Sequence, residues 1–488
     1  MRVGMIVVLL GMVVAVAGLV ALLCGGLVKD TAGQLRYGVM LDAGSSGTRV
    51  YVYTWYANPP EDRTYPEVNA HPVFLKIKPG LSEFGGASAA EVRAYLRPLL
   101  EFADSQVPDS KQYLTPIFLR ATAGLRLLPQ VQQDFLMREV IASFKALTDF
   151  SIVPGIRAAR VIEGTHEGAY MYVAVNQALG NLRRTVPINA TVGILDCGGA
   201  STQIAFAPRN LSPSDIPSAY TAPYTPGVYT TSYLLYGKNQ ARYRMYNVLK
   251  TLPDAGVPGI PNAYYDPCEP LGANHTSAAA GITLFGSSNA TLCEMLAVQL
   301  LNASDSCPYT SCGMQGQYQP DLARHGPETG IFYATDNYAA GARAVGFALN
   351  TTHTPEAYRA ATRAFCALDA SAQAAALPPA YDEDHPCFIA MWTSALLLEG
   401  YNFAPSAPIA FVQEVNNYDM SWTLGAILYE ARIFEYPALK PRLQLKTGSA
   451  YTAVMLVFGA LLLAGIALVA VPLLVRARRR RPSDYTEF

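Results

Sequence analysis

One sequence pattern occurs twice in this chain of 488 residues, at residues 41–48 and again at residues 195–202. Both copies read Leu-Asp-x-Gly-x-x-x-Thr between apolar segments. An Asp at the end of a buried strand is costly unless it is paired or lies near a cation. The Gly- and Ser-rich turn that follows exposes backbone N–H groups, which bind phosphate. Asp42 and Asp196 are therefore predicted to hold a hard divalent cation through its water molecules, in two hairpins facing one cleft. For either copy alone, an ordinary hairpin turn is the alternative.

A third segment, residues 160–170, contains two carboxylates and a histidine. Glu167 lies between glycines near the predicted start of a helix, so its side chain can approach a bound substrate. A carboxylate within hydrogen-bond reach of a water molecule can orient and deprotonate that water. Glu167 is therefore the candidate general base. The alternative is that it only occupies the first helical turn, where the helix dipole favours acidic residues. Glu163 and His166 are expected at the surface.

Strands and helices that alternate along the chain are predicted to position these residues. Strands are expected at residues 37–41, 50–53, 117–120 and 192–195, and helices at residues 89–103, 131–147 and 160–180, the last entered through Gly164. Such alternation favours an α/β fold, and the repeated hairpin suggests a duplicated domain. Residues 207–285 are rich in Pro, Tyr and Asn and predict long loops or an insertion.

Two uncharged apolar segments, residues 3–28 and 450–475, are each longer than the roughly 20 residues that a transmembrane helix needs. Arg2 precedes the first segment, and arginines from Arg476 onward follow the second. The positive-inside rule therefore predicts that both ends, including the tail 476–488, are cytoplasmic and that the middle is lumenal or extracellular. A cleaved signal peptide is the alternative for the first segment. A buried core helix is the alternative for the second.

Cysteines and glycosylation sequons support an oxidising location for the middle of the chain. Six of the 8 cysteines lie between residues 268 and 387, an even number that predicts three disulfides. Pairing in sequence order is favoured because Cys307 and Cys312 flank a short loop, and a zinc site without any CxxC pair is the alternative. N-glycosylation is predicted at the sequons of Asn189, Asn210, Asn274, Asn289, Asn302 and Asn350.

Five motifs, in order, resemble those of the apyrases, the nucleoside triphosphate diphosphohydrolase family of the actin, heat-shock-chaperone and sugar-kinase superfamily. They lie at residues 39–49, 119–126, 164–170, 195–203 and 421–426, and residues 78–82 and 236–237 also fit. The resemblance implies two RNase H-like α/β lobes with the active-site cleft between them. Lobe I would comprise residues 37–163 and 414–440, and lobe II would comprise residues 164–413 and carry the disulfides.

The resemblance also implies roles for individual residues. Asp42 and Asp196 would hold Ca²⁺ or Mg²⁺ through water, Glu167 would be the base, and Ser201 and Gln203 would help to place the attacking water. Phosphate contacts are implied for Ser45, Ser46, Gly47, Thr48, Thr122, Gly198, Gly199 and Ala200. Tyr338 would stack on the nucleobase. The implied disulfides are Cys268–Cys293, Cys307–Cys312 and Cys366–Cys387.

Two features resemble the Golgi and lysosomal branch of that family. Gly47 stands where cell-surface members usually carry His, and apolar segments occur at both ends of the chain. The expected location is a Golgi, lysosomal or plasma membrane. The last residues, Tyr485 to Phe488, fit a Tyr-x-x-bulky sorting signal and predict a sorting adaptor as partner. The net charge of -1 gives no sign of a nucleic-acid-binding surface.

The expected reaction is hydrolysis of nucleoside tri- or diphosphates to the monophosphate and phosphate, by metal-assisted in-line attack of water. Two alternatives remain. A kinase of the sugar-kinase type would pass the phosphoryl group to an acceptor and would need no water-directing Glu167. A nucleotide-binding receptor or adhesion domain would bind without turnover.

Overall fold

The computed structural model describes residues 27–29, 35–56, 62, 64–153, 157–223, 225–303, 305–433, 443–445, 471 and 475. The chain divides into a large unit, Leu35–Glu435, and a second unit made of Met1–Gln34 and Tyr436–Phe488. In the second unit, β1 (Leu27–Lys29) pairs antiparallel with β19 (Leu443–Leu445). Leu27 and Val28 were predicted to end the first spanning helix, but they belong to β1.

The remaining predictions for the chain ends fall almost wholly outside the described residues. These are the apolar segments at residues 3–28 and 450–475, the tail 476–488 and its sorting signal. Within the part of the chain that the structure describes, no helix has the length and apolar character needed to cross a membrane.

The first sheet of the large unit has the strand order β4-β3-β2-β5-β6, and β7 also pairs with β5. Its strands are β2 (Leu35–Gly44), β3 (Gly47–Tyr56), β4 (Val73–Ile77), β5 (Pro116–Ala121), β6 (Ser151–Ile152) and β7 (Ala159–Val161). The pairs β4–β3 and β3–β2 are antiparallel, whereas β2–β5, β5–β6 and β5–β7 are parallel. The antiparallel strands β4, β3 and β2 are thus followed, beyond β2, by the parallel strands β5, β6 and β7.

The second sheet repeats this arrangement, with the strand order β10-β9-β8-β14-β16-β15. Its strands are β8 (Gly193–Cys197), β9 (Ser201–Phe206), β10 (Tyr229–Leu234), β14 (Phe332–Asp336), β15 (Thr352–His353) and β16 (Ile409–Phe411). Here β10–β9 and β9–β8 are antiparallel, and β8–β14 and β14–β16 are parallel. The α/β prediction is confirmed, and the shared order and direction are what a duplicated domain produces. One sheet falls within each predicted lobe, while the lobe limits themselves stay a prediction.

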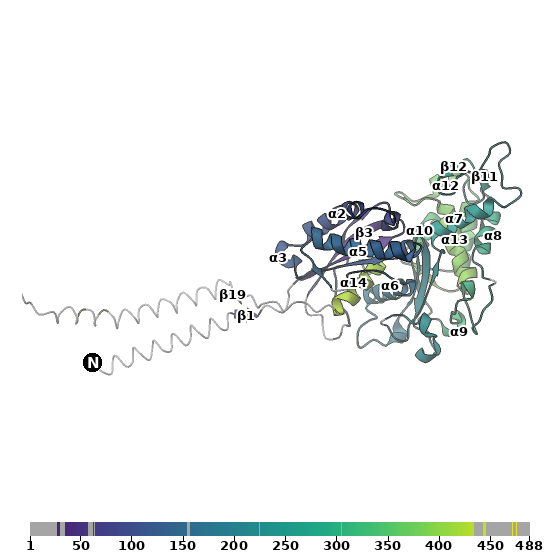
Figure 1. Cartoon of the computed structure of the whole chain (residues 1–488). Coiled ribbons are helices and arrows are strands. Elements are labelled where there is room, and N and C mark those ends of the chain that lie inside the picture. Colours follow the sequence, from purple (N-terminus) through teal and green to yellow (C-terminus); the bar gives the residue numbers. More distant parts are fainter. Residues whose placement is uncertain are drawn as a thin grey trace, which may run out of the picture. The chain divides into compact units, whose positions relative to one another are not determined.

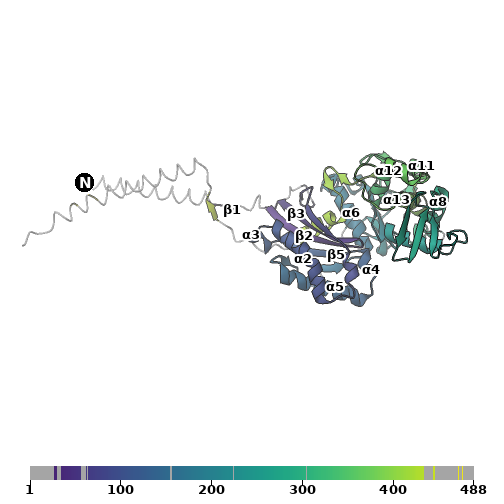
Figure 2. The ribbon, with the colours of Figure 1, turned by 90° about the horizontal axis from the view of Figure 1, so that it is seen from above.

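Two helices lie between the sheets. Helix α6 (Gly164–Ala178) packs on β8, β9 and β10, and α14 (Trp422–Ile433) packs on β2 and on α6 (Figure 1). The outer face of the first sheet is covered by α2 (Ala89–Gln106) and α5 (Gln130–Leu147), where Val39 and Leu41 of β2 join their core (Figure 2). The order of layers is therefore helices, sheet, α6 with α14, and second sheet.

The other helices surround the second sheet or connect strands. They are α3 (Asp109–Gln112), α4 (Ala123–Arg126), α7 (Lys238–Leu249), α8 (Ala290–Gln299), α9 (Leu322–His325), α10 (Asn337–Ala344), α11 (Pro355–Cys366), α12 (Ala370–Ala376) and α13 (Pro386–Ala395). Single turns occur at Leu81–Phe84, Ile188–Ala190, Pro213–Asp215, Ser218–Tyr220, Met314–Gly316 and Leu396–Gly400. A two-stranded pair joins β17 (Glu414–Val415) to β18 (Tyr418–Asp419).

The segment predicted to be loops or an insertion, residues 207–285, also contains regular structure. It includes β10, α7 and a small sheet of β11 (Ala263–Asp266), β13 (Ile282–Gly286) and β12 (Asn274–Ser277). The disulfides Cys268–Cys293, Cys307–Cys312 and Cys366–Cys387 form as the resemblance implied. Cys197 is a buried free thiol.

Helices α6 and α14 cross at very short range. A Cβ atom on Gly425 of α14 would lie 1.8 Å from the backbone oxygen of Tyr170 in α6. The same helix is tied to the first sheet by a buried ion pair, in which Arg120 Nη2 lies 2.5 Å from Glu430 Oε1. Only glycine permits this crossing, which explains the Gly in the motif at residues 421–426.

We predict that Gly425→Ala destabilises the protein by about 1–3 kcal/mol, because the added methyl group overlaps the α6 backbone. Chemical denaturation of the full chain measures the effect. The matched control is Gly86→Ala, since no heavy atom lies within 4 Å of a Cβ there, and it should change stability by less than about 0.5 kcal/mol. Equal stability of the two variants would show that the crossing tolerates a side chain.

Candidate active site

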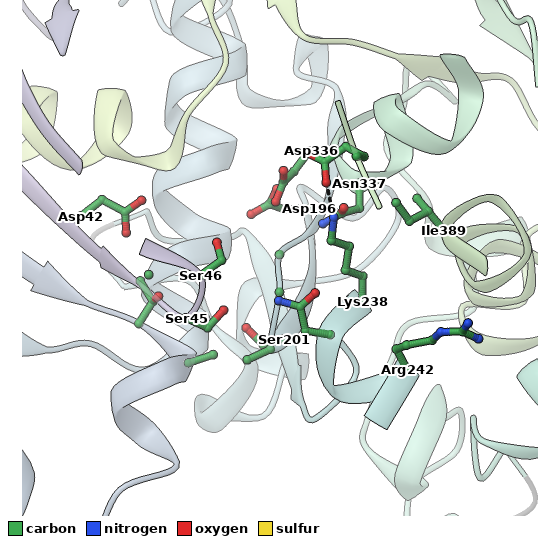
Figure 3. Close-up of a pocket in the computed structure, with 18 of the residues that line it drawn as sticks. Asp42, Ser45, Ser46, Asp196, Ser201, Lys238, Arg242, Asp336, Asn337 and Ile389 are labelled. Carbon is green, nitrogen blue, oxygen red and sulfur yellow. Dashed lines mark hydrogen bonds and ion pairs between the residues drawn. The ribbon is translucent and has the colours of Figure 1, made fainter. Parts of the chain in front are cut away.

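Both repeated hairpins are present, and their turns line one cavity of about 430 Å³. Gly44 pairs with Gly47 across the first turn, and Cys197 pairs with Thr202 at the second. Asp42 and Asp196 both line the cavity, and Figure 3 shows them on opposite sides of it (Figure 3). The predicted shared cleft is therefore present within the large unit.

The residues opposite the two aspartates stand at the same register position in both hairpins. Arg49 faces Asp42 across β2 and β3, and Gln203 faces Asp196 across β8 and β9. Arg49 Nη1 lies 3.2 Å from Asp42 Oδ2 and forms an ion pair with it. Gln203 turns instead toward Ser201, to whose Oγ its Nε2 donates a hydrogen bond of 2.8 Å.

A third aspartate, Asp336, joins the cavity from the end of β14. Its backbone has φ 53° and ψ -120°, which is a strained conformation for a non-glycine residue. The next residue holds it there, because Asn337 Nδ2 donates a hydrogen bond of 2.5 Å to the carbonyl of Cys197. The sequence analysis did not identify Asp336, although its place after an apolar strand is the same signal that identified Asp42 and Asp196.

Burial dominates the electrostatics of the three aspartates. It raises the pKa of Asp42, with Arg49 opposing the shift. It also raises the pKa values of Asp196 and Asp336, and repulsion from Asp336 adds to the effect at Asp196. Asp42 and Asp196 are buried, whereas Asp336 is exposed on the cavity wall. Three carboxylates in one cavity repel one another in their ionised forms, and a cation between them would relieve that repulsion.

The donor set fits a hard divalent cation. Asp42 Oδ1 is buried and accepts no hydrogen bond from any residue that the structure describes. Asp196 Oδ1 accepts a bond of 2.8 Å from Thr335 Oγ1, which fixes the orientation of that carboxylate. Carboxylate and water oxygens are the ligands that Mg²⁺ and Ca²⁺ prefer.

Glu167 lies in the first turn of α6 and is buried beside β9 and β10. A Cβ atom on the next residue, Gly168, would lie 2.4 Å from Thr230 Oγ1, so glycine allows α6 to approach β10 this closely. Glu167 forms an ion pair with Arg126, and it accepts a long hydrogen bond of 3.5 Å from Gln203 Nε2. The prediction that Glu167 can face a substrate is thus consistent with its position on the cavity wall.

The surroundings of Glu167 shift its pKa toward neutral pH. Burial raises its pKa to about 7, and the charge of Arg126 opposes the rise. Arg126 Nη2 also donates a hydrogen bond of 3.1 Å to Ser201 Oγ, so one guanidinium connects the carboxylate and the hydroxyl. Sequence reasoning missed Arg126 as a site residue, although it ends the motif at residues 119–126.

Several basic side chains on the cavity wall were not singled out from the sequence. They are Arg49, Lys76, Lys78, Lys238 and Arg242. Lys78 opens the segment at residues 78–82, and Lys238 follows the segment at residues 236–237, so their neighbourhoods carried the signal. Lys238 forms an ion pair with Glu383, which also lines the cavity. These basic residues can contact a polyanionic ligand, although Asp382, Glu383 and Asp384 also line the cavity.

Ten of the residues predicted for the site line the cavity. They are Asp42, Ser45, Ser46, Thr122, Glu167, Asp196, Gly198, Gly199, Ala200 and Ser201. Gln203 lies directly behind Ser201, as described above. Gly47 and Thr48 lie just outside the lining: a Cβ on Gly47 would meet the backbone oxygen of Ile77 at 2.7 Å, and Thr48 Oγ1 accepts a bond of 2.8 Å from Tyr95 Oη.

The prediction for Tyr338 is wrong in this structure. Its side chain is 0% exposed and belongs to the core of the second sheet, so it cannot stack on a base in the cavity. Tyr338 is the second residue of α10, and its ring lies in the core on which that helix packs. Phe388 and Ile389 at the start of α13 provide apolar cavity lining instead.

The side chains of all six sequon asparagines are exposed, so a glycan has room at each of them. Asn289 also caps α8, because its Oδ1 accepts a hydrogen bond of 3.0 Å from the backbone nitrogen of Leu292. Occupancy of the sequons stays a prediction.

Comparisons with known proteins agree with this geometry. The chain is 28% identical over 466 residues to ectonucleoside triphosphate diphosphohydrolase 4 of Homo sapiens, covering 82% of this chain and 73% of that protein. It is 29% identical over 441 residues to nucleoside-diphosphatase mig-23 of Caenorhabditis elegans, covering 82% of this chain and 77% of that protein.

A solved structure shares the fold. The nucleoside triphosphate hydrolase of Neospora caninum superposes with a TM-score of 0.56 at 16% identity, covering 81% of this chain and 92% of that one. The sequence model of the GDA1/CD39 (nucleoside phosphatase) family matches residues 28–446. The chain therefore belongs to the GDA1/CD39 family of nucleoside phosphatases.

Proposed function

We propose that this chain hydrolyses nucleoside tri- and diphosphates to the monophosphate and phosphate, with Glu167 as the general base and a divalent cation as cofactor. One observation carries the proposal. Two matched hairpins bring Asp42 and Asp196 to a single cavity that basic side chains also line, with Glu167 on its wall.

The terminal phosphate would lie between the two turns. The hydroxyls of Ser45, Ser46 and Thr122 line its pocket on one side, and Gly198, Gly199 and Ala200 line it on the other. When bound, a divalent cation held through water by Asp42 and Asp196 would neutralise phosphate charge. Lys76, Lys78 and Arg49 add fixed positive charge to the same wall.

The attacking water would sit beside Ser201, where Gln203 and Arg126 hold the hydroxyl in place. Glu167 would take its proton as the water attacks in line with the leaving phosphate. A kinase needs no such carboxylate next to the turn, which favours hydrolysis over transfer to an acceptor. A receptor without turnover would need no water-positioning set at all.

We further propose that each sheet with its helices forms an RNase H-like lobe, divided near residues 163 and 413, and that the nucleotide lies between the lobes. Phe388 and Ile389 replace Tyr338 as candidates for contact with the nucleobase. Both residues line the same cavity as the two turns.

The proposed location is a membrane of the secretory or endocytic pathway, with the active site on the lumenal or extracellular side. The apolar segments at residues 3–28 and 450–475 would anchor the chain, and Tyr485 to Phe488 would engage a sorting adaptor. Three disulfides and six exposed sequons support an oxidising, glycosylating compartment for the large unit.

The purified full-length chain should release phosphate from nucleoside tri- and diphosphates without any added acceptor. EDTA should abolish the release, and excess Mg²⁺ or Ca²⁺ should restore it, because the buried aspartates need a cation to hold phosphate beside them. A colorimetric phosphate assay over a panel of nucleotides measures both effects. Phosphate transfer to an acceptor, with no release in its absence, would establish the kinase alternative.

Glu167→Gln should lower kcat by about 100- to 10,000-fold, because an amide cannot take the proton of water. Nucleotide binding should persist, since the turns and basic residues are unchanged. In the unaltered protein, kcat/KM should fall as the pH drops below about 7, where Glu167 becomes protonated.

The control for this variant is Glu163→Gln, the same change at an exposed position four residues earlier. It should leave both kcat and the pH profile unaltered. If Glu167→Gln kept most of the turnover, another group would have to be the base.

Cation affinity should rise with pH. The metal-free aspartates hold protons above their ordinary range because burial raises their pKa values, and a cation must displace those protons. The apparent Kd for Mg²⁺ or Ca²⁺ should therefore fall as pH increases from about 5 to about 8, well above the ordinary Asp value of roughly 3.9. Calorimetry in buffers of different ionisation enthalpy should detect the released protons.

Asp196→Asn should remove most of this binding and of the proton release. The exposed Asp254→Asn should change neither. Equal cation affinity at both ends of the pH range would contradict the assignment of these carboxylates.

A further inference from the structure

A second group of possible metal ligands lies beside the active-site cavity. Glu269, His275 and His385 each offer one ligand atom, and these atoms all lie within 4.8 Å of one another. Glu269 is buried and the two histidines are partly buried. This cluster, called the Glu-His-His cluster below, shares no residue with the aspartates of the proposed cation site.

The three residues come from separate segments that meet at one point. Glu269 follows β11, His275 lies on β12, and His385 directly precedes α13. His385 Nδ1 lies 2.6 Å from Glu269 Oε1, and the two imidazole centroids are 4.8 Å apart. The cluster therefore joins the small sheet to α13.

Disulfides hold both sides of the cluster. Cys268, adjacent to Glu269, is bonded to Cys293, and Cys387, two residues after His385, is bonded to Cys366. His275 is held by Tyr246, whose hydroxyl lies 3.1 Å from His275 Nε2. Ligands on such a braced frame are largely preorganised, which lowers the cost of ordering them around an ion.

The charge around the cluster favours a cation. Arg242 forms ion pairs with both Asp266 and Glu269, at 2.6 Å and 2.5 Å. One guanidinium therefore faces two buried carboxylates, and one negative charge remains while both imidazoles are neutral. A buried negative charge of this kind needs a positive partner, which is either a proton on a histidine or a metal ion.

We propose that the Glu-His-His cluster binds a borderline divalent transition metal, Zn²⁺ in the first place, as a site distinct from that of the hard cation. Imidazole nitrogens with one carboxylate suit Zn²⁺, whereas the oxygen-only set of Asp42, Asp196 and Asp336 suits Mg²⁺ or Ca²⁺. Because His385 and Arg242 also line the active-site cavity, the ion would add positive charge at the cavity wall near the start of α13.

A bound ion would have to replace the hydrogen bond between His385 and Glu269. Ligand atoms on tetrahedral Zn²⁺ lie about 3.3 Å apart, given metal–ligand distances of roughly 2.0–2.1 Å. The present 2.6 Å separation is that of a short hydrogen bond, so Zn²⁺ would take the place of its proton and part the two atoms slightly. Binding should then depend on pH and should compete with protonation of the imidazoles.

The test is equilibrium dialysis of the untagged full-length protein against Zn²⁺, with excess Mg²⁺ present to occupy the hard-cation site and without nucleotide. We expect one tightly held Zn²⁺ per chain. His275→Ala and His385→Ala should each weaken that binding by about 100-fold or more. The control His353→Ala removes a histidine that packs on Phe347, away from the cluster, and should bind Zn²⁺ as the unaltered protein does.

A second measurement needs no variant. Co²⁺ added in place of Zn²⁺ should give the visible absorption of a four-coordinate nitrogen and oxygen site, and Zn²⁺ should bleach it. Circular dichroism of each variant without metal shows whether it is folded. The proposal is overturned if the unaltered protein holds no Zn²⁺ when excess Mg²⁺ is present, or if the His275→Ala and His385→Ala variants bind Zn²⁺ as tightly as the unaltered protein does. Since no step of the test uses nucleotide, its result is independent of the hydrolase activity.

Discussion

The close approach of α6 to its neighbours is the contact on which the rest of the large unit depends. This one helix packs on three strands of the second sheet and crosses α14, which itself packs on the first sheet. Glycines at 168 and 425 make both approaches possible, because a single methyl group would overlap Thr230 on one side and the Tyr170 backbone on the other. The position of one hairpin relative to the other therefore depends on two close contacts, one with the Thr230 side chain and one with the Tyr170 backbone. Glu167 lies on the same helix, so its distance from both turns is set by the same packing.

A second constraint is electrostatic. Four acidic residues, Asp42, Glu167, Asp196 and Asp336, line one cavity, the first three of them buried, and each has a raised pKa. Such an arrangement is unfavourable for folding by itself. It becomes favourable when a cation and a polyphosphate occupy the cavity together, since the ion offsets the aspartates and the basic wall offsets the phosphates. Ligand binding and stability of this unit should therefore be linked.

Local patterns in the sequence were sufficient for much of this site. The hairpins and their aspartates could be predicted because each depends on a short segment with a strand, a glycine turn and a polar residue at a defined spacing. Glu167 could be predicted because it lies between glycines near a helix start. The strand order of the second sheet could not be predicted, since β14 and β16 join it from more than a hundred residues along the chain. Tyr338 was misplaced for a related reason. The family resemblance suggests a tyrosine as the base-stacking residue. The side on which α10 packs, however, is decided by the core formed with Tyr401, Phe411 and other distant residues. Arg126 and Asp336 stand at a motif end and a strand end that the sequence shows, but their approach to the other site residues depends on packing between segments far apart in the chain.

The duplicated hairpins are not equivalent, and one of the matched positions at which they differ changes the charge beside the aspartate. Where the first hairpin has Arg49 against its aspartate, the second has Gln203, a neutral amide that turns away from Asp196. Two identical hairpins would present the same side chains to both ends of a phosphate chain. Because Arg49 is replaced by a neutral amide in the second hairpin, the two halves of the cavity differ in charge. Asp42 is paired with a cationic side chain, whereas Asp196 is not, which leaves room beside it for a water molecule. The two hairpins enclose one cavity together, and the difference between Arg49 and Gln203 makes its two halves unequal in charge.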